Sequence, residues 1–577
     1  MGIAAMTVDG LYALASLDGA PLPMSDRRTL GLTRDTDDRM LLVTREGGEA
    51  IVGVDHALLG HIDERDALAV MLGLPLATPS ATLARAALAR FGDDAPSHML
   101  GEWTYVAWDS DSATLTLMAS DTLRDRLLFA SDGRRVAVAS HVAALARLDW
   151  VESAPDTANL LLYMGRAPMR GTIGDRTMLR DVRRVTAGTC VRISRAGVRT
   201  SVRAPLPAPT PWRGNFADAV DALDALLRRI SREQMTRHPS SAVLLSGGLD
   251  SSLTTVFAAA ERGAGTLIAL TSAAPVGSGL PDETAFARQV ADQAGIAMRS
   301  VIPATDADPF RPADAMLRWL QHPVMSPRHY LYDSLYREAL AHGADAVLDG
   351  CEGEWSVTAY PDGLGLRQRM RDGLFGLAGR LAARSPQDGF QVQLSSSALR
   401  IAERELRPAL HVPSAATKIH RRDEMWGYSP SIVQSLNETT TTPMPGLRRL
   451  LPLRDRRLLM LFAGLPYRFV TEGGVNRAVG RALLAGKVPD TVRLRTRGMP
   501  FSPDYASRIH RHAQSTRERL PDYVRAGVGE WLDLAWLDGA LGAIAARPEA
   551  PYDLIFKAQA TAMAAAFLSH WLDDIRA

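Results

Sequence analysis

Residues 244–252 read LLSGGLDSS, an apolar run followed by two glycines, an aspartate and two serines. A buried strand ends here and a helix begins, because SSAVLLSGG (240–248) is apolar and LDSSLTTVFAAAERG (249–263) has helical spacing. Glycines let a backbone approach an anion closely, and the free N–H groups at the start of a helix point toward that anion. The stretch therefore predicts a phosphate site at a strand-to-helix turn.

The polar side chains of this stretch suit the same ligand. Ser246, Ser251 and Ser252 offer hydroxyl donors, and Asp250 can hold a magnesium ion against phosphates. The alternative is a tight turn in which one Asp or Ser caps the helix. A cap needs a single such residue, whereas every residue here except Leu249 suits a phosphate site, so we favour the phosphate site.

Strands and helices alternate from residue 216 onward. The predicted strands include GTLIALTSA (265–273) and GADAVLDG (343–350), and the predicted helices include FADAVDALDALLRRISREQM (216–235) and PDETAFARQVADQAGI (281–296). This alternation indicates a parallel, doubly wound sheet, in which ligands bind beyond the carboxyl ends of the strands. The C-terminal region is predicted to be mostly helical.

The first 200 residues have a different pattern, with short strands separated by Gly and Asp turns. These strands fall in MLLVTREGGEAIVGVD (40–55), EWTYVAWDSDSATLTLMAS (102–120), RRVAVAS (134–140) and GTCVRIS (188–194). They predict packed antiparallel sheets with one helix at ATLARAALARFGD (81–93). Four prolines then interrupt any element in APLPAPTPWRGN (204–215). We therefore expect two domains, residues 1–203 and 216–577, joined by a linker at 204–215.

Composition limits the class of protein. With 577 residues, 46% hydrophobic and 23% charged, the chain is typical of a folded protein with two or more domains. The net charge of +2, with balanced signs, predicts no nucleic-acid surface. No apolar run is long enough to span a membrane, and MGIAAMTVDG lacks the basic region of a signal peptide. Cys190 and Cys351 form no disulfide framework, and we expect a cytoplasmic protein.

SGGLDSS resembles the pyrophosphate loop (PP-loop) of enzymes that split ATP into AMP and pyrophosphate, and no GxxxxGK[ST] motif is present. That family includes asparagine synthetase, β-lactam synthetase, GMP and NAD synthetases and tRNA-thiolating enzymes. The resemblance implies ATP and Mg²⁺ as cofactors. It also implies an adenylated intermediate that a nucleophile displaces from AMP.

Three further segments resemble asparagine synthetase. DGCEGEW (349–355) is similar to the GxGxDE turn, which implies that Glu354 is a second magnesium ligand beside Asp250. Residues 465–505 resemble the stretch that ends in R-x-K-x-x-F, and residues 101–148 resemble the glutaminase half. The implied fold is an Ntn-glutaminase-like αββα sandwich, followed by a PP-loop (adenine nucleotide alpha hydrolase-like) parallel-sheet domain with a helical C-terminal region. The implied ATP-binding residues are Leu244, Ser246, Gly247, Gly248, Asp250, Ser251, Ser252, Thr271, Asp349 and Gly350.

The N-terminal domain departs from that family at its nucleophile. The resemblance implies a cysteine after the initiator methionine, but this chain has Gly2. Neither Cys190 nor Cys351 can replace it, because the chemistry uses the free α-amino group of that cysteine as the base. We therefore expect no glutamine hydrolysis, and an amine already present in the substrate is the simplest replacement. β-Lactam synthetases and lasso-peptide cyclases use such an amine.

Three other positions are candidate catalytic residues. Cys351 and Glu352 replace the usual residues of the turn, and the family lysine corresponds to Arg497 in LRTRG. Cys351 is either catalytic or plain packing, and Glu352 is either the base for the attacking amine or a solvated carboxylate. Arg497 keeps the charge that would stabilise the intermediate but cannot donate a proton at neutral pH. Arg495 is either a phosphate ligand or a salt-bridge partner.

The resulting prediction is a lasso-peptide macrolactam cyclase. It would adenylate an Asp or Glu side chain of a ribosomal precursor peptide and close an amide ring with the peptide's N-terminal amine. The resemblance implies a leader peptidase and a precursor-recognition protein as partners. HRRDEMWGYSP (420–430) and three tryptophans, Trp531, Trp536 and Trp571, either line a peptide groove or belong to the core. An ammonia-dependent asparagine synthetase, another small-molecule amide or β-lactam synthetase, and a catalytically silent scaffold remain alternatives.

Overall fold

The computed structural model describes most of the chain. The described residues are 10–30, 40–46, 49–52, 55–121, 127–166, 173–201, 209–319, 322–323, 326–359, 385–410, 444, 446–496, 498–547 and 549–576. The predicted catalytic residue Arg497 and the segment 420–430 lie outside these residues.

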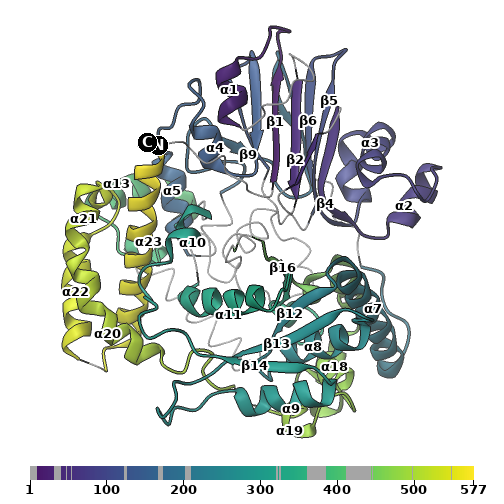
Figure 1. Cartoon of the computed structure of the whole chain (residues 1–577), viewed down its shortest axis with the longest axis vertical. Helices are drawn as coiled ribbons and strands as arrows, with labels where there is room; N and C mark the ends of the chain where they lie inside the picture. Colours follow the sequence, from purple (N-terminus) through teal and green to yellow (C-terminus); the bar gives the residue numbers. More distant parts are fainter. Residues whose placement is uncertain are drawn as a thin grey trace.

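Two antiparallel sheets form the N-terminal domain (Figure 1). The first has the order β3-β2-β1-β8-β7-β9, with β1 (Gly10–Ser16), β2 (Met40–Glu46), β3 (Glu49–Val52), β7 (Leu128–Ser131), β8 (Arg135–Ala139) and β9 (Arg183–Arg184). The second has the order β11-β10-β6-β5-β4, with β4 (His56–Ile62), β5 (Gly101–Asp109), β6 (Thr114–Ala119), β10 (Cys190–Ser194) and β11 (Gly197–Thr200).

Side-chain alternation along the strands builds four layers. In β1, Leu11 and Ala13 point into the core between the two sheets, whereas Tyr12 and Leu14 face the opposite side. On that side lie α1 (Met24–Thr29), α4 (Val142–Ala146) and α5 (Thr157–Met164), and the second sheet is covered by α2 (Arg65–Leu72), α3 (Ser80–Phe91) and η1 (Gly92–His98). The predicted αββα sandwich is confirmed.

The third sheet is parallel, with the order β14-β13-β12-β15-β16. Its strands are β12 (Ser240–Leu244), β13 (Thr266–Ser272), β14 (Ala297–Val301), β15 (Ala346–Leu348) and β16 (Arg448–Leu450). Val243 faces a core built with α7 (Phe216–Arg237), α8 (Leu249–Glu261), α9 (Thr284–Ala294) and α18 (Ala478–Leu483), and Leu244 faces α11 (His329–Ala341). Helices therefore cover both faces, as Figure 1 shows, and the predicted doubly wound sheet is confirmed.

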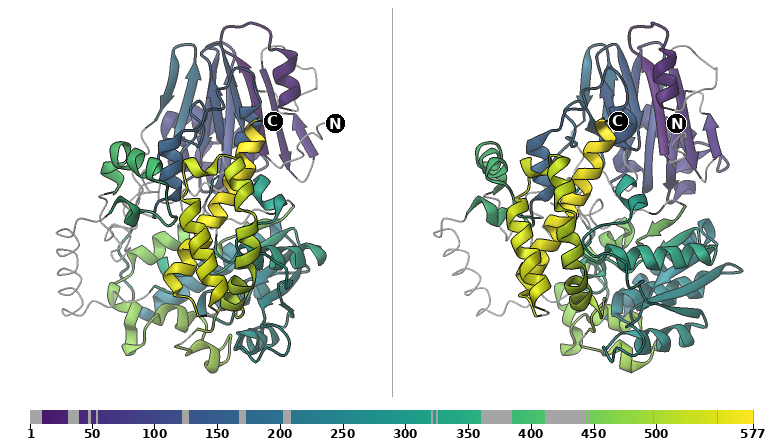
Figure 2. Two further views of the ribbon diagram at one scale, coloured as in Figure 1. Left: turned by 90° about the vertical axis from the view of Figure 1, so that its left-hand side faces the viewer. Right: turned by 60° about the vertical axis from the view of Figure 1, so that its left-hand side comes forward.

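The C-terminal helices pack against the N-terminal domain (Figure 2). They are α20 (Tyr505–Glu518), α21 (Leu520–Arg525), α22 (Leu534–Ala546) and α23 (Tyr552–Arg576). The earlier helix α13 (Ser396–Glu405) shares their core. Leu145 and Leu160 of the sandwich share one core with Trp531 and Trp571. These two tryptophans are therefore core residues, and Trp536 packs against the same core half-buried.

Shorter helices complete the fold: η2 (Gly353–Trp355), α10 (Asp314–Trp319), η3 (Pro386–Gly389), α14 (Arg407–Leu410), η5 (Pro452–Arg454), α17 (Arg456–Gly464), η6 (Tyr467–Gly474), α19 (Asp490–Arg493) and η7 (Val528–Glu530). Residues 209–215 of the predicted linker form neither helix nor strand, and the domain limits at 203 and 216 stay predictions. Within the described residues, no helix is long and apolar enough to cross a membrane.

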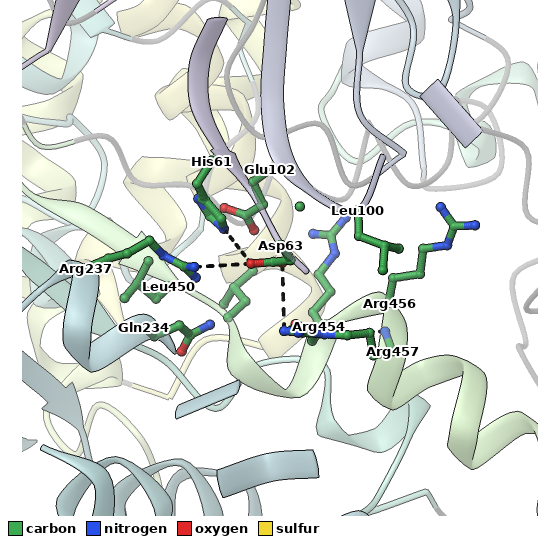
Figure 3. Close-up of a pocket in the computed structure, with 13 residues that line it drawn as sticks. His61, Asp63, Leu100, Glu102, Gln234, Arg237, Leu450, Arg454, Arg456 and Arg457 are labelled. Carbon is green, nitrogen blue, oxygen red and sulfur yellow. Dashed lines mark hydrogen bonds and ion pairs between the residues drawn. The ribbon is translucent and has the colours of Figure 1, made fainter. Parts of the chain in front are cut away.

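An ionic cluster around Asp63 joins the sandwich to the parallel-sheet domain (Figure 3). Asp63 follows β4 and accepts a hydrogen bond of 3.2 Å from Arg237 Nη1. Arg457 Nη2 lies 3.9 Å from Asp63 Oδ2 and 2.7 Å from Glu233 Oε2. Burial, reinforced by the nearby Asp455 and opposed by Arg237 and Arg457, raises the pKa of Asp63 to about 6.

Candidate active site

The glycine–serine loop joins β12 to α8 at the switch point of the sheet. The strand order runs from β12 toward β14 on one side and toward β16 on the other, which leaves a crevice beyond β12 and β15. Gly247 has φ +69°, a conformation that favours glycine, and a Cβ there would lie 2.5 Å from Phe286 Cβ. Ser251 Oγ accepts from Ser246 N at 3.2 Å, which closes the loop over the first turn of α8.

A cavity of ≈ 300 Å³ opens beyond the ends of β12, β13 and β15. The predicted site residues that line it are Leu244, Ser246, Gly248, Asp250, Ser251, Thr271, Asp349, Gly350, Cys351, Glu352 and Glu354. Leu245, Leu270, Ser272, Tyr332, Leu335 and Phe501 complete the lining. The structure therefore brings together both segments that the sequence singled out, although they are about a hundred residues apart.

Two predicted residues have a different place. Ser252 is fully buried in α8 and is absent from the cavity lining, so the prediction that its hydroxyl binds phosphate is not supported. The reason is helical geometry: Ser251 bonds to the loop, and the next residue lies about 100° further round the helix. Gly247 does not line the cavity either, and it packs on Phe286.

Two carboxylates, the half-buried Asp250 and the exposed Glu354, line the cavity beside the loop. Thr358 Oγ1 donates to Asp250 Oδ1, and Arg477 Nη2 lies 3.5 Å from Asp250 Oδ2. Partial desolvation raises the pKa of Asp250 and of Glu354, and the charge of Asp250 further raises the pKa of Glu354. Two carboxylates that disfavour each other's ionisation beside a phosphate loop suit Mg²⁺, whose remaining ligands are commonly waters and phosphate oxygens. The described residues hold no cluster of three or more metal-binding side chains.

The turn after β15 is pressed against the first turn of α8. A Cβ on Gly350 would lie 2.6 Å from the Asp250 carbonyl carbon, so the close approach requires glycine. The Asp349 carboxylate accepts from Arg449 Nη2 at 2.7 Å. Asp349 also accepts from Cys351 N at 3.0 Å, which fixes the shape of the turn.

Cys351 and Glu352 occupy contrasting environments. Arg449 Nη2 lies 3.2 Å from Cys351 Sγ, but burial and the charge of Asp349 raise the pKa of the thiol well above its usual range. A thiol held protonated is a poor nucleophile, which favours packing over catalysis for Cys351. Glu352 adopts φ +70°, is buried, and lies 3.3 Å from Arg454 Nε, and no described residue donates a hydrogen bond to either carboxylate oxygen.

Sequence reasoning missed Arg477 and Thr358. Arg477 Nε donates to the Thr358 carbonyl at 2.8 Å, and both side chains contact Asp250. Arg477 lies within a segment that resembles asparagine synthetase, but nothing in its local spacing distinguishes it from the neighbouring arginines. Of the two alternatives for Arg495, the structure shows a salt-bridge partner: Arg495 Nη2 lies 2.8 Å from Glu283 Oε1.

Comparison with known proteins gives two family matches. Residues 222–550 match asparagine synthase, and residues 73–203 match the glutamine amidotransferase domain. Comparison with curated proteins gives no match. Among solved structures, glutamine phosphoribosylpyrophosphate amidotransferase from B. subtilis, complexed with ADP and GMP, has a TM-score of 0.22 at 9% identity, covering 59% of this chain and 75% of that one. A second solved structure, that of the allosteric regulatory enzyme of purine biosynthesis, has a TM-score of 0.23 at 9% identity, covering 54% of this chain and 78% of that one.

The asparagine synthase match, with the glycine–serine loop and two carboxylates at the switch point of a parallel sheet, defines an ATP-dependent carbon–nitrogen ligase. Because the match covers more than half of the chain, the protein belongs to the asparagine synthase family. Enzymes of this family use ATP. The N-terminal sandwich is an Ntn-amidotransferase-like domain.

Proposed function

We propose that the protein is a macrolactam cyclase of lasso-peptide biosynthesis. It adenylates the side-chain carboxylate of an Asp or Glu in a ribosomal precursor peptide. The peptide's own N-terminal amine then attacks the acyl-adenylate, and the ring closes as an amide. The products are the macrolactam, AMP and pyrophosphate.

The observation that supports this proposal is an adenylation site without a suitable ammonia source. The cavity combines the loop, Asp250 and Glu354, which adenylation needs. Of the two cysteines, Cys190 is buried in β10, where burial raises its pKa to about 12, and Cys351 belongs to the other domain. An amine tethered to the substrate replaces free ammonia, because intramolecular attack gains a high effective concentration.

The lining residues have distinct roles in this proposal. Ser246, Gly248 and Ser251 bind the pyrophosphate leaving group, while Leu244, Thr271 and the turn at Asp349–Gly350 surround the rest of the nucleotide. Mg²⁺, held by Asp250 and Glu354, would neutralise phosphate charge. A substrate carboxylate oxygen bonds to the α-phosphorus as the bond to pyrophosphate breaks.

The second step forms the amide. The amine nitrogen bonds to the acyl carbon, its proton passes to the Glu352 carboxylate, and the bond from carbon to AMP breaks. We assign Arg497 to the stabilisation of the developing negative charge, so Arg497→Ala should lower turnover more than ATP affinity. A leader peptidase and a precursor-recognition protein would supply the free N-terminal amine and the bound peptide.

The test is AMP release from Mg-ATP, compared between the leader-freed precursor peptide encoded beside the gene and aspartate with ammonium. AMP formed only with the peptide, with a product one water lighter, establishes the cyclase. AMP formed with aspartate and ammonium returns the protein to asparagine synthesis. Failure to bind Mg-ATP at all would support a scaffold role.

A further inference from the structure

The first turn of α9 contacts two separate loops of the active site. One is the glycine–serine loop, where Gly247 packs on Phe286 so closely that a Cβ would lie 2.5 Å from the Phe286 Cβ. The other consists of residues 494–496 and 498–501, which we call the strap. On the strap, the Arg495 guanidinium lies 4.1 Å from the centre of the Phe286 ring. Phe286 therefore contacts both the glycine–serine loop and the strap.

Glu283 precedes α9 and holds the strap at two points. Its Oε1 accepts from Arg495 Nη2 at 2.8 Å and from the backbone N–H of Met499 at 3.2 Å. The side chain is 9% exposed and that of Arg495 is 11% exposed, so the pair is largely shielded from water. A buried carboxylate with one salt bridge and one backbone donor is strongly oriented, because losing either partner leaves a charge unpaired.

The strap itself ends in the cavity. Phe501 lines the cavity, with its ring centre 5.5 Å from that of Tyr332, and its carbonyl accepts from Ser272 Oγ at 2.7 Å. The start of α9 is tied to the same sheet edge, since Asp282 Oδ2 accepts from Ala274 N at 2.9 Å, just beyond β13. The start of α9, which carries Glu283, is thus fixed relative to both the sheet and the glycine–serine loop.

We propose that Glu283 is a positioning residue that holds the strap in register with the glycine–serine loop. The inference rests on the proposed function of the cavity as the ATP site. Glu283 does not line the cavity, so it acts through Arg495 and the Met499 backbone rather than on the substrate. Arg481 also holds the start of the strap, because it donates to the carbonyl of Arg495 and to that of the preceding Arg493.

Glu283→Gln tests this proposal, because it keeps the shape of the side chain but removes the charge that Arg495 needs. A misplacement of about 1 Å costs about 100-fold in rate, so we expect turnover to fall by about 10- to 100-fold. The dissociation constant of Mg-ATP should change by less than about threefold, since Glu283 does not line the nucleotide cavity. Glu283→Asp, which keeps the charge, should recover part of the rate.

Limited trypsin digestion provides a second readout that does not need the peptide. Glu283→Gln should accelerate cleavage within 493–498, identified by mass spectrometry, while cleavage elsewhere stays unchanged. Glu261→Gln is the matched control, because Glu261 is also a shielded carboxylate paired with arginines, 2.9 Å from Arg232 Nη2 and 3.5 Å from Arg228 Nη1, outside the cavity. It should leave turnover and cleavage as in the wild type.

Two results would overturn the proposal. One is wild-type turnover and wild-type cleavage in Glu283→Gln. The other is a loss of turnover that is matched by equal losses of ATP binding and thermal stability, which indicates a general structural role. If the wild-type enzyme shows no turnover with any peptide, the proposed function fails, and the digestion still tests the strap.

Discussion

The Asp250 carboxylate occupies the space that a side chain at Gly353 would need. A Cβ added to Gly353 would lie 2.1 Å from Asp250 Oδ1 and 2.9 Å from Thr358 Oγ1, well inside van der Waals contact. The two active-site segments, the start of α8 and the turn after β15, therefore interlock at Gly353 as well as at Gly350. The position of the proposed magnesium ligand depends on this absence of a side chain.

Gly353→Ala should displace the Asp250 carboxylate and lower AMP formation by about 100-fold or more. The measurement is AMP release with the substrate that the wild type turns over, together with Mg-ATP binding by calorimetry. Gly539→Ala is the control, because a Cβ at Gly539 in α22 meets nothing within 4 Å. Wild-type turnover in Gly353→Ala would show that the Asp250 position does not matter.

Asp250→Asn should abolish AMP release without weakening the fold. Burial raises the pKa of Asp250, so its ionised form opposes folding at neutral pH, and a neutral amide removes that cost. The thermal midpoint should therefore stay equal or rise while activity is lost. Differential scanning fluorimetry and the AMP assay measure the two effects separately, and a fully active Asp250→Asn enzyme would exclude Asp250 as a metal ligand.

Glu352→Gln should separate the two steps of the reaction. A general base contributes about 10²- to 10⁴-fold to a rate, and Glu352 is proposed to act only when the amine attacks. Substrate-dependent exchange between ATP and pyrophosphate should persist, while amide formation slows by about 100-fold or more. Equal losses in both assays would instead assign Glu352 a structural role through its ion pair with Arg454.

Glutamine should not serve as a nitrogen donor. Cys190 is 1% exposed within β10, where burial raises its pKa to about 12, so it cannot supply the thiolate that glutamine hydrolysis needs. The measurement is glutamate release from glutamine by the wild type and by Cys190→Ser and Cys351→Ser. Glutamate release that either replacement stops would restore a glutaminase to the N-terminal domain.

The parts of the site that could be predicted are those formed by consecutive residues. The glycine–serine loop and the turn at 349–354 each have their functional residues within one short segment, so spacing and resemblance were enough to identify them. Arg477 and Thr358 reach Asp250 from 227 and 108 residues away, and their approach depends on how β15 and the later helices pack. The salt-bridge partner of Asp349 could not be predicted either, because Arg449 comes from the neighbouring strand β16.

The Asp63 cluster predicts how stability depends on pH. The pKa of Asp63 is raised from 3.8 to about 6 in the folded protein, so the folded state binds its proton more tightly than the unfolded chain. Its ionisation therefore lowers stability as pH rises from about 4 to 6, by up to about 3 kcal/mol at about 1.4 kcal/mol per pKa unit. Above pH 6 that loss is complete.

Asp63→Asn should therefore raise the thermal midpoint at pH 8, and the gain should shrink as the pH is lowered to 5. Asp224→Asn is the control, for which we expect the opposite change in stability. Burial tends to raise the pKa of Asp224, but hydrogen bonds from Lys487 and Arg228 lower it below its usual value. That variant should be less stable than the wild type at pH 8. If Asp63→Asn lowers the midpoint equally at pH 5 and pH 8, the pairing with Arg237 outweighs the cost of burying the Asp63 charge.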